Sequence, residues 1–159
     1  MPKTERKYLA HFLDASFGGQ STNYVRLGKD LEEYNEELNP EVETKENILG
    51  ETSVNHKGYK PQSEVSPFYV YDDDPLATQL FAIINERKTA DGCQTTKVDV
   101  LINADGTVAW AYREDVLVVP NSSGGDTSGV QIPFTIYSMG NRTAGTFNLS
   151  TKVFSVPNG

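Results

Sequence analysis

The sequence predicts a mainly β protein, a β-sandwich with one flanking helix. Apolar and polar residues alternate in Val98–Ile102, Val108–Tyr112 and Val130–Tyr137, a spacing typical of strands that bury one face. A different spacing, that of an amphipathic helix, occurs at about residues 74–88. The length of 159 residues fits a single domain, residues 1–159.

The first part of the chain is predicted to be largely extended. Residues 1–23 are expected to form an N-terminal arm, although residues 8–14 have the character of a strand. Apolar residues of the acidic stretch 31–38 fall at helical spacing, so a short helix competes with a strand there, and Pro40 would end it. Residues 42–48 alternate and indicate a strand with one polar face.

A polar connector at about residues 49–61 is predicted to be an extended loop. A loop of this length is uncommon in a compact domain unless it is functional or disordered. An aromatic strand, Pro67–Tyr71, should follow. The helix should open at Asp74-Pro75, because aspartate can cap free N–H groups and proline suits the first turn. Arg87 and Lys88 are placed in its last turn, where cations complement the helix dipole.

The second half of the chain is predicted to consist of strands. A hairpin should turn at Asn103–Gly106, and Val116–Val119 reads as a short buried run. Residues 121–129 are expected to be a flexible loop. Pro133 indicates an edge strand or a bulge within residues 130–137, and Phe147–Val153 is read as the last strand.

Composition and motifs point away from catalysis. The net charge of −8 argues against sequence-specific DNA binding, which needs clustered lysine and arginine. The single cysteine, Cys93, allows no intrachain disulfide. His11 and His56 are too few for a metal site, and no catalytic motif is recognisable, so we expect no cofactor, no metal and no enzyme activity. The acids at 72–74 could bind calcium, but a helix cap is the stronger interpretation.

The order of these segments resembles the major tail tube proteins of long-tailed bacteriophages, whose fold is shared with contractile-tail and type VI secretion tubes. The resemblance covers residues 24–155 and is a pattern of elements. It rests on Arg26-Leu-Gly-Lys-Asp-Leu through Leu38-Asn-Pro-Glu-Val-Glu-Thr-Lys, the connector with Gly58-Tyr-Lys-Pro, Pro67-Phe-Tyr-Val-Tyr before the Asp-Pro helix, Asn103-Ala-Asp-Gly-Thr-Val-Ala-Trp, and the late strand from Val130 to Tyr137.

The resemblance implies a structural protein of the virion tail, assembled in the bacterial cytoplasm. Its copies would form hexameric rings that stack into a hollow tube with an acidic lumen, through which DNA passes without specific binding. The implied partners are the protein itself, a tape-measure protein, a tail-tip initiator and a tail terminator, with no membrane. The residues implied to face the lumen are Glu32, Glu36, Glu41 and Glu43. Those implied in contacts between rings are Glu51, Asn55, His56, Lys57 and Tyr59.

Three alternatives remain open. One is another tube or tail-completion protein of the same fold. Another is a carbohydrate-binding β-sandwich module that uses Trp110, Tyr112 and Tyr137, although Trp110 and Tyr112 share the face of Val108 and are read as core. The third is a hydrolase with paired carboxylates, for which the sequence singles out no acid.

Overall fold

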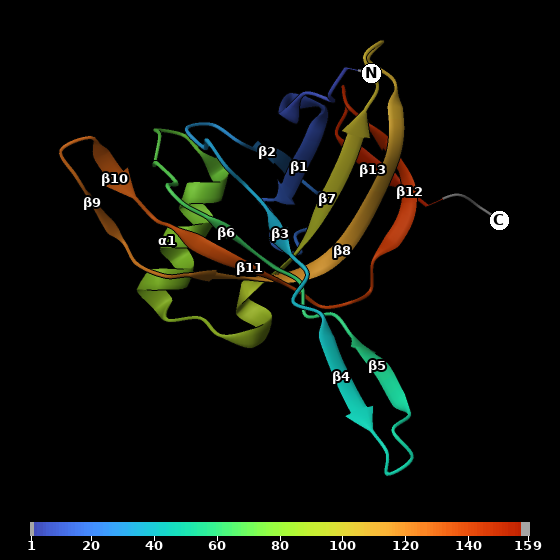
Figure 1. The fold of residues 1–159 in the computed structure, drawn as a ribbon. Helices are drawn as coiled ribbons and strands as arrows, with labels where there is room; N and C mark the ends of the chain where they lie inside the picture. The colour runs from blue at the N-terminus through green and yellow to red at the C-terminus, as the bar shows by residue number, and fades with distance from the viewer. Residues whose placement is uncertain (1, 157–159) are drawn as a thin grey trace.

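The computed structural model describes residues 2–156, and the predicted mainly β fold with one α-helix is confirmed (Figure 1). One large, curled antiparallel sheet has the strand order β2-β1-β7-β8-β11-β6-β3. In that order the strands are β2 (Tyr24–Leu27), β1 (Leu9–Asp14), β7 (Gln94–Ile102), β8 (Val108–Pro120), β11 (Phe134–Ser138), β6 (Gln62–Val65) and β3 (Glu36–Glu37).

The remaining elements flank this sheet. Strand β12 pairs with β8 beside β11 and also with β13, and two separate ribbons are formed by β4 with β5 and by β9 with β10. Their bounds, with those of the helices, are β12 (Thr143–Asn148), β13 (Val153–Ser155), β4 (Glu41–Glu46), β5 (Thr52–Gly58), β9 (Gly124–Asp126), β10 (Gly129–Gln131), α1 (Pro75–Glu86), and the 3-10 turns η1 (Arg6–Tyr8) and η2 (Ala90–Cys93). Within the described residues, no helix is long and apolar enough to cross a membrane.

The predicted hairpin at residues 103–106 is confirmed and forms the centre of the sheet. Gly106 N–H donates to Asn103 O at 2.9 Å, and Gly106 adopts a φ of +93°, a value that glycine reaches without strain. Strand β8 pairs with β7 along one edge, while its other edge is divided between β12 and β11.

Two apolar cores lie on opposite faces of the sheet, because successive strand residues point to opposite sides. Leu13 belongs to the core under α1, together with Leu80 and Phe134. Its neighbour Phe12 belongs to the second core and packs on Phe147 with ring centroids 4.7 Å apart.

Helix α1 begins as predicted, since Asp74 Oδ1 accepts a hydrogen bond from Leu76 N at 3.0 Å. It ends at Glu86, so the placement of Arg87 and Lys88 in its last turn is wrong. Arg87 adopts the left-handed conformation with φ +53°, and its N–H donates to carbonyls of the final turn. This geometry turns the chain out of the helix.

The strand character expected for residues 8–14 is confirmed by strand β1, which pairs with β2 on one edge and β7 on the other, so the expected arm at residues 1–23 contains a sheet strand. Of the two alternatives for residues 31–38, the helix does not form. The segment is irregular up to the short strand β3, and Tyr34 within it is buried. The Tyr34 ring lies 4.4 Å from the ring of His11, measured between centroids.

The order of strands around the aromatic segment differs from the prediction. Pro67–Tyr71 has only an isolated bridge, Tyr69 with Gln131, and the sheet strand is β6, just before it. Residues 130–137 are divided into β10 and β11 at Ile132-Pro133, because proline has no N–H for the ladder. The predicted loop 121–129 contains β9.

The predicted last strand is a second hairpin. Asn148 Oδ1 accepts hydrogen bonds from Ser150 N at 2.9 Å and Thr151 N at 3.0 Å. This turn separates β12 from β13, which pair through Phe147 and Phe154. Local side-chain capping of the backbone therefore ends the strand that the apolar pattern had extended to Val153.

Candidate functional site

The most prominent feature is a β-hairpin arm, residues 41–58, that projects away from the body (Figure 1). The prediction of an extended loop at residues 49–61 is therefore wrong. Thr52–Gly58 is the return strand of a hairpin whose first strand is the acidic β4. The turn is fixed by Asn47, whose Oδ1 accepts from Leu49 N at 2.9 Å and Glu51 N at 3.0 Å.

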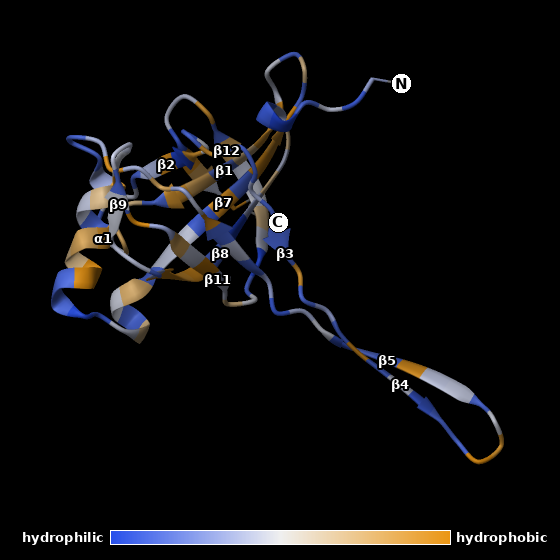
Figure 2. Ribbon diagram, turned by 60° about the vertical axis from the view of Figure 1, so that its left-hand side comes forward, coloured by the Kyte–Doolittle hydropathy of each residue, from blue (hydrophilic) through white to orange (hydrophobic). Residues whose placement is uncertain are grey.

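The arm has almost no support from its own subunit. Ile48 is fully exposed, and Leu49 is 78% exposed. Val42 and Val54 on the arm strands are also exposed. Figure 2 shows hydrophobic residues at the end of the hairpin and on strand β5, in a hairpin that is otherwise largely hydrophilic. Because a two-stranded hairpin alone is marginally stable in water, the arm is expected to need another surface. We call residues 46–51 the arm tip.

Charges along the arm strands are largely compensated. Glu41 pairs with Lys60 at 2.6 Å, and Glu43 pairs with Lys57 at 2.8 Å and Lys45 at 3.2 Å. These lysine hydrogen bonds hold the pKa of both glutamates below the usual range. Exposed pairs of this kind contribute little stability. Their effect is to leave the arm strands nearly neutral.

The four glutamates assigned to a lumen do not form one surface. Glu41 and Glu43 lie on β4 of the arm. Glu36, on β3, makes an ion pair with the buried Lys97 inside the body. Glu32 lies in the loop before β3 and lines a cavity there.

The five residues assigned to contacts between rings all lie on the arm or at its base, and all are exposed. The Tyr59 ring packs edge-on against His56, with centroids 4.7 Å apart. The full set is Glu51, Asn55, His56, Lys57 and Tyr59. The apolar tip residues Ile48 and Leu49 were missed, although two adjacent aliphatic residues in a polar stretch are a readable signal.

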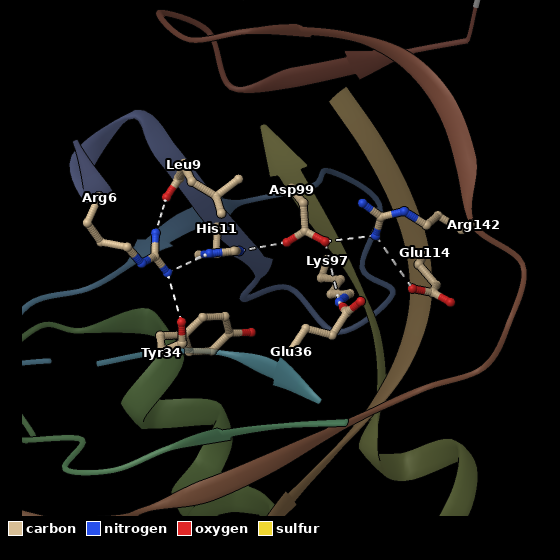
Figure 3. Close-up of polar contacts among 9 residues, drawn as sticks. All are labelled: Arg6, Leu9, His11, Tyr34, Glu36, Lys97, Asp99, Glu114 and Arg142. Carbon is tan, nitrogen blue, oxygen red and sulfur yellow. Dashed lines mark hydrogen bonds and ion pairs between the residues drawn. The ribbon is translucent and has the colours of Figure 1, made fainter. Parts of the chain in front are cut away.

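A charge network with a buried centre crosses the body (Figure 3). At its centre, Asp99 accepts hydrogen bonds from His11 Nδ1 at 2.8 Å and Arg142 Nη1 at 2.9 Å. Lys97 Nζ lies 3.4 Å from Asp99 Oδ2 and also binds Glu36. Buried charges require such partners, so the network ties β7 to β1, to β3 and to the loop before β12.

Arg6 extends the network to the N-terminal segment. Its Nη2 donates to Tyr34 O at 3.0 Å and lies 2.9 Å from His11 Nε2. Arginine can only donate, so Nε2 of His11 accepts and Nδ1 faces Asp99. The histidine therefore connects Arg6 to Asp99.

The environment fixes the ionisation of the central pair. Burial alone would raise the pKa of Asp99, but the His11 hydrogen bond and the Lys97 charge outweigh it and hold that pKa well below its usual range. Burial alone would lower the pKa of Lys97, but Asp99 and Glu36 outweigh it, so this pKa is raised. The sequence gives no sign of the network, because Lys97 and Asp99 look like the solvent-facing positions of an ordinary strand.

An open cavity of about 500 Å³ lies between the N-terminal segment, β2 and the loop before β3. Four cationic side chains line it, together with leucines from β1, β2 and the loop. The cations are Arg6, Lys7, Arg26 and Lys29, and the leucines are Leu9, Leu27 and Leu31. We call this the basic cavity.

The aromatic residues considered for carbohydrate binding do not form a flat platform. Trp110 is 37% exposed, so the expectation that it is a core residue is wrong, and Tyr112 is only half-buried. Their rings are steeply inclined, at 62°. Ala111 is the buried residue between them, because β8 turns that face toward the second core. Tyr137 is exposed on β11.

Comparison with solved structures identifies proteins that share the fold of this chain. No protein-family model matches the sequence, and no curated protein matches it. Among solved structures, the chain is similar to the sheath/tube terminator of the PVC extracellular contractile injection system, with TM-score 0.60 and 10% identity over 92% of this chain and 99% of that one.

Two further structures share the fold. The tube-terminating cap of the anti-feeding prophage has TM-score 0.57 and 12% identity, over 92% of this chain and 93% of that chain. A chain of the PVC sheath-tube complex in its extended state has TM-score 0.53 and 12% identity, over 86% and 87%. The chain thus has the fold of these tube-associated proteins.

Proposed function

We propose that this chain is a structural subunit of a bacteriophage-type tail tube. Copies would close into rings, hexameric by the resemblance in sequence pattern, and the rings would stack around a lumen that delivers DNA to the host. The observation that carries the proposal is the projecting arm with its uncovered apolar tip. The fold shared with tube-associated proteins supports the same assignment.

The energetics of the arm favour assembly. Burying a leucine or isoleucine side chain contributes about 1.5–3 kcal/mol. Covering Ile48 and Leu49 would therefore contribute on the order of 3–6 kcal/mol per arm. The free subunit lacks this contribution, because both side chains are exposed. An arm that reaches a different surface on the next copy makes a heterologous contact, and such contacts generate closed rings or open filaments.

The charge of the chain suits a conduit for DNA. A net charge of −8 disfavours adhesion to phosphate. Of the four glutamates assigned to the lumen, Glu41 and Glu43 keep that proposed role. Glu36 instead pairs with Lys97, and Glu32 lines the cavity beside the N-terminal segment. Assembly in a particle would also involve a tape-measure protein, an initiator and a terminator.

Electron microscopy and sedimentation velocity of concentrated protein test the function. We expect rings or tubes from the unaltered chain, and their loss in Ile48→Ser/Leu49→Ser, because the arm tip would no longer bury apolar surface. Met139→Ser is the matched control, since Met139 is 51% exposed but lies outside the arm. A protein that stays monomeric at high concentration, or tubes that are indifferent to the tip substitutions, would contradict the proposal.

A second candidate is a terminating ring that closes the end of a tube. Its support is that two of the similar structures are a tube terminator and a tube-terminating cap. The same images separate the two roles. Tubes that lengthen with protein concentration indicate the tube subunit, whereas discrete rings that never stack indicate the terminator.

A further inference from the structure

The basic cavity holds positive charge that the subunit itself does not compensate. Within residues 2–156, Arg6, Arg26 and Lys29 make no ion pair, and Lys7 pairs only with the exposed Glu5 at 3.1 Å. Two acids, Glu32 and Glu33, also line the cavity, so cations remain in excess. This arrangement is unexpected in a chain with 22 acidic and 14 basic residues. By contrast, Lys45, Lys57 and Lys60, on the arm and at its base, all have carboxylate partners.

The cations are held in place by groups that leave their charge intact. Arg6 Nη1 donates to Leu9 O at 2.6 Å, and Arg26 Nη2 donates to Lys7 O at 2.5 Å. Lys29 Nζ lies 3.9 Å from the centroid of the Tyr71 ring. Each guanidinium has five N–H donors, so both arginines keep further donors for an incoming carboxylate.

The cavity therefore suits a ligand that carries carboxylates beside aliphatic side chains, since leucines form the rest of its wall. The arm tip has this composition. It reads Glu46-Asn-Ile-Leu-Gly-Glu51, with two acids, two exposed aliphatic residues and no cation. Neither Glu46 nor Glu51 makes an ion pair in the described part of the chain.

We propose that the basic cavity of one copy receives the arm tip of a second copy of this chain, an inference that rests on the proposed tube function. In both views the arm leaves the body away from the N-terminal segment, which forms one wall of the cavity (Figures 1 and 2). Glu46 and Glu51 approach the arginines and Lys29, while Ile48 and Leu49 lie against the leucines. The contact is head-to-tail and leaves a free arm and a free cavity at the two ends of any chain of copies.

Charge reversal tests the pairing without removing either surface. One variant carries Arg26→Glu and Lys29→Glu in the cavity, and the other carries Glu46→Lys and Glu51→Lys in the tip. Each variant alone places like charges together, so we expect each to stay monomeric. An equal mixture places opposite charges at every contact and should recover assembly. Recovery supports the proposal, whereas assembly by either variant alone, or no recovery from two folded variants, overturns it.

Disulfide trapping gives a second readout that does not depend on long assemblies. All proteins carry Cys93→Ala, which removes the buried natural thiol. Leu49→Cys protein is mixed with Glu32→Cys protein, which places a thiol at the cavity, or with Ser123→Cys protein, which places one on the exposed loop before β9. We expect cross-linking at the cavity to be about tenfold faster or more, and to slow with added salt.

The two proposals can fail separately. If the unaltered protein forms rings or tubes but the cavity thiol cross-links no faster than the loop thiol, the arm tip binds elsewhere and the tube function stands. If the unaltered protein neither assembles nor shows the faster cross-link, both proposals are wrong.

Discussion

Replacing Asp99 by asparagine should destabilise the folded subunit strongly while changing its shape very little. The side chain is 8% exposed and faces Lys97, whose side chain is 4% exposed, together with Arg142 and His11. Asparagine has the same size but no charge. The Lys97 ammonium would then rely on Glu36 alone, and Arg142 would lose its shortest ion pair, since its contact to Glu114 is 3.9 Å.

The magnitude follows from the cost of an uncompensated buried charge. Removing one partner of a buried ion pair typically costs about 3–5 kcal/mol, and the amide oxygen of asparagine can keep one hydrogen bond. We therefore take the lower end, about 3 kcal/mol. For a domain of this size the midpoint of thermal unfolding falls by about 2–4 °C per kcal/mol, which gives a fall of about 6–12 °C.

The pH dependence gives an independent check. Because the pKa of Asp99 is lowered in the folded state, its contribution to stability is fully present above the unfolded value, about pH 4, and is lost as the pH falls through the folded pKa. The difference in unfolding free energy between wild type and Asp99→Asn should stay constant from about pH 7 to pH 5 and shrink below about pH 4.

Urea unfolding at several pH values, followed by circular dichroism, measures both quantities. Asp72→Asn is the matched control, because Asp72 is exposed and its side chain makes no hydrogen bond or ion pair within residues 2–156. The argument fails if the two variants lose similar stability. It also fails if the loss in Asp99→Asn is unchanged at the lowest pH.

Further substitutions test the packing of α1, its N-terminal cap and the pairing of β12 with β13. Leu80→Ala, in the fully buried centre of α1, should cost about 2–5 kcal/mol in urea unfolding, whereas Ala82→Gly on the same helix should cost about 1 kcal/mol. Asp74→Ala should cost about 1 kcal/mol by losing the cap to Leu76 N, and a loss within error would show that this cap is unimportant. Gly145→Ala should detach β13 from β12, because the new Cβ would lie 2.4 Å from the Phe154 ring and 2.5 Å from Ser155 O. Amide hydrogen exchange of residues 153–155 measures this effect, and unchanged protection there would refute the steric argument.

Elements with strong local signals were predicted correctly. The hairpin around Asn103–Gly106 needed only its turn residues and the alternating strands on either side. The start of α1 needed only Asp74-Pro75 and the spacing of its apolar residues. In each case the deciding interactions lie within a few residues of one another.

Predictions failed where a distant contact decides the conformation. The stretch 31–38 left a helix and a strand as alternatives because its apolar residues fall at helical spacing. Tyr34 packs on His11, which is far away in sequence, and only Glu36–Glu37 form a strand. Trp110 shares the strand face of Val108 and Tyr112, which are half-buried, yet Trp110 itself is 37% exposed. The connector was predicted to be a loop because its composition is polar. It is a strand because β4 pairs with it, and that pairing is not visible in its composition.

The sequence alone determined the mainly β class, the single amphipathic helix, the central hairpin and the acidic net charge, because periodicity, turn chemistry and charge are local or additive properties. Only the tertiary structure decided that the connector is half of a projecting arm, that Lys97 and Asp99 are buried together, and that Arg6, Arg26 and Lys29 share a cavity. These features join residues from different strands and loops. The curl of the sheet and the pairing of its strands bring these residues together, and neither can be predicted from a short segment of the sequence.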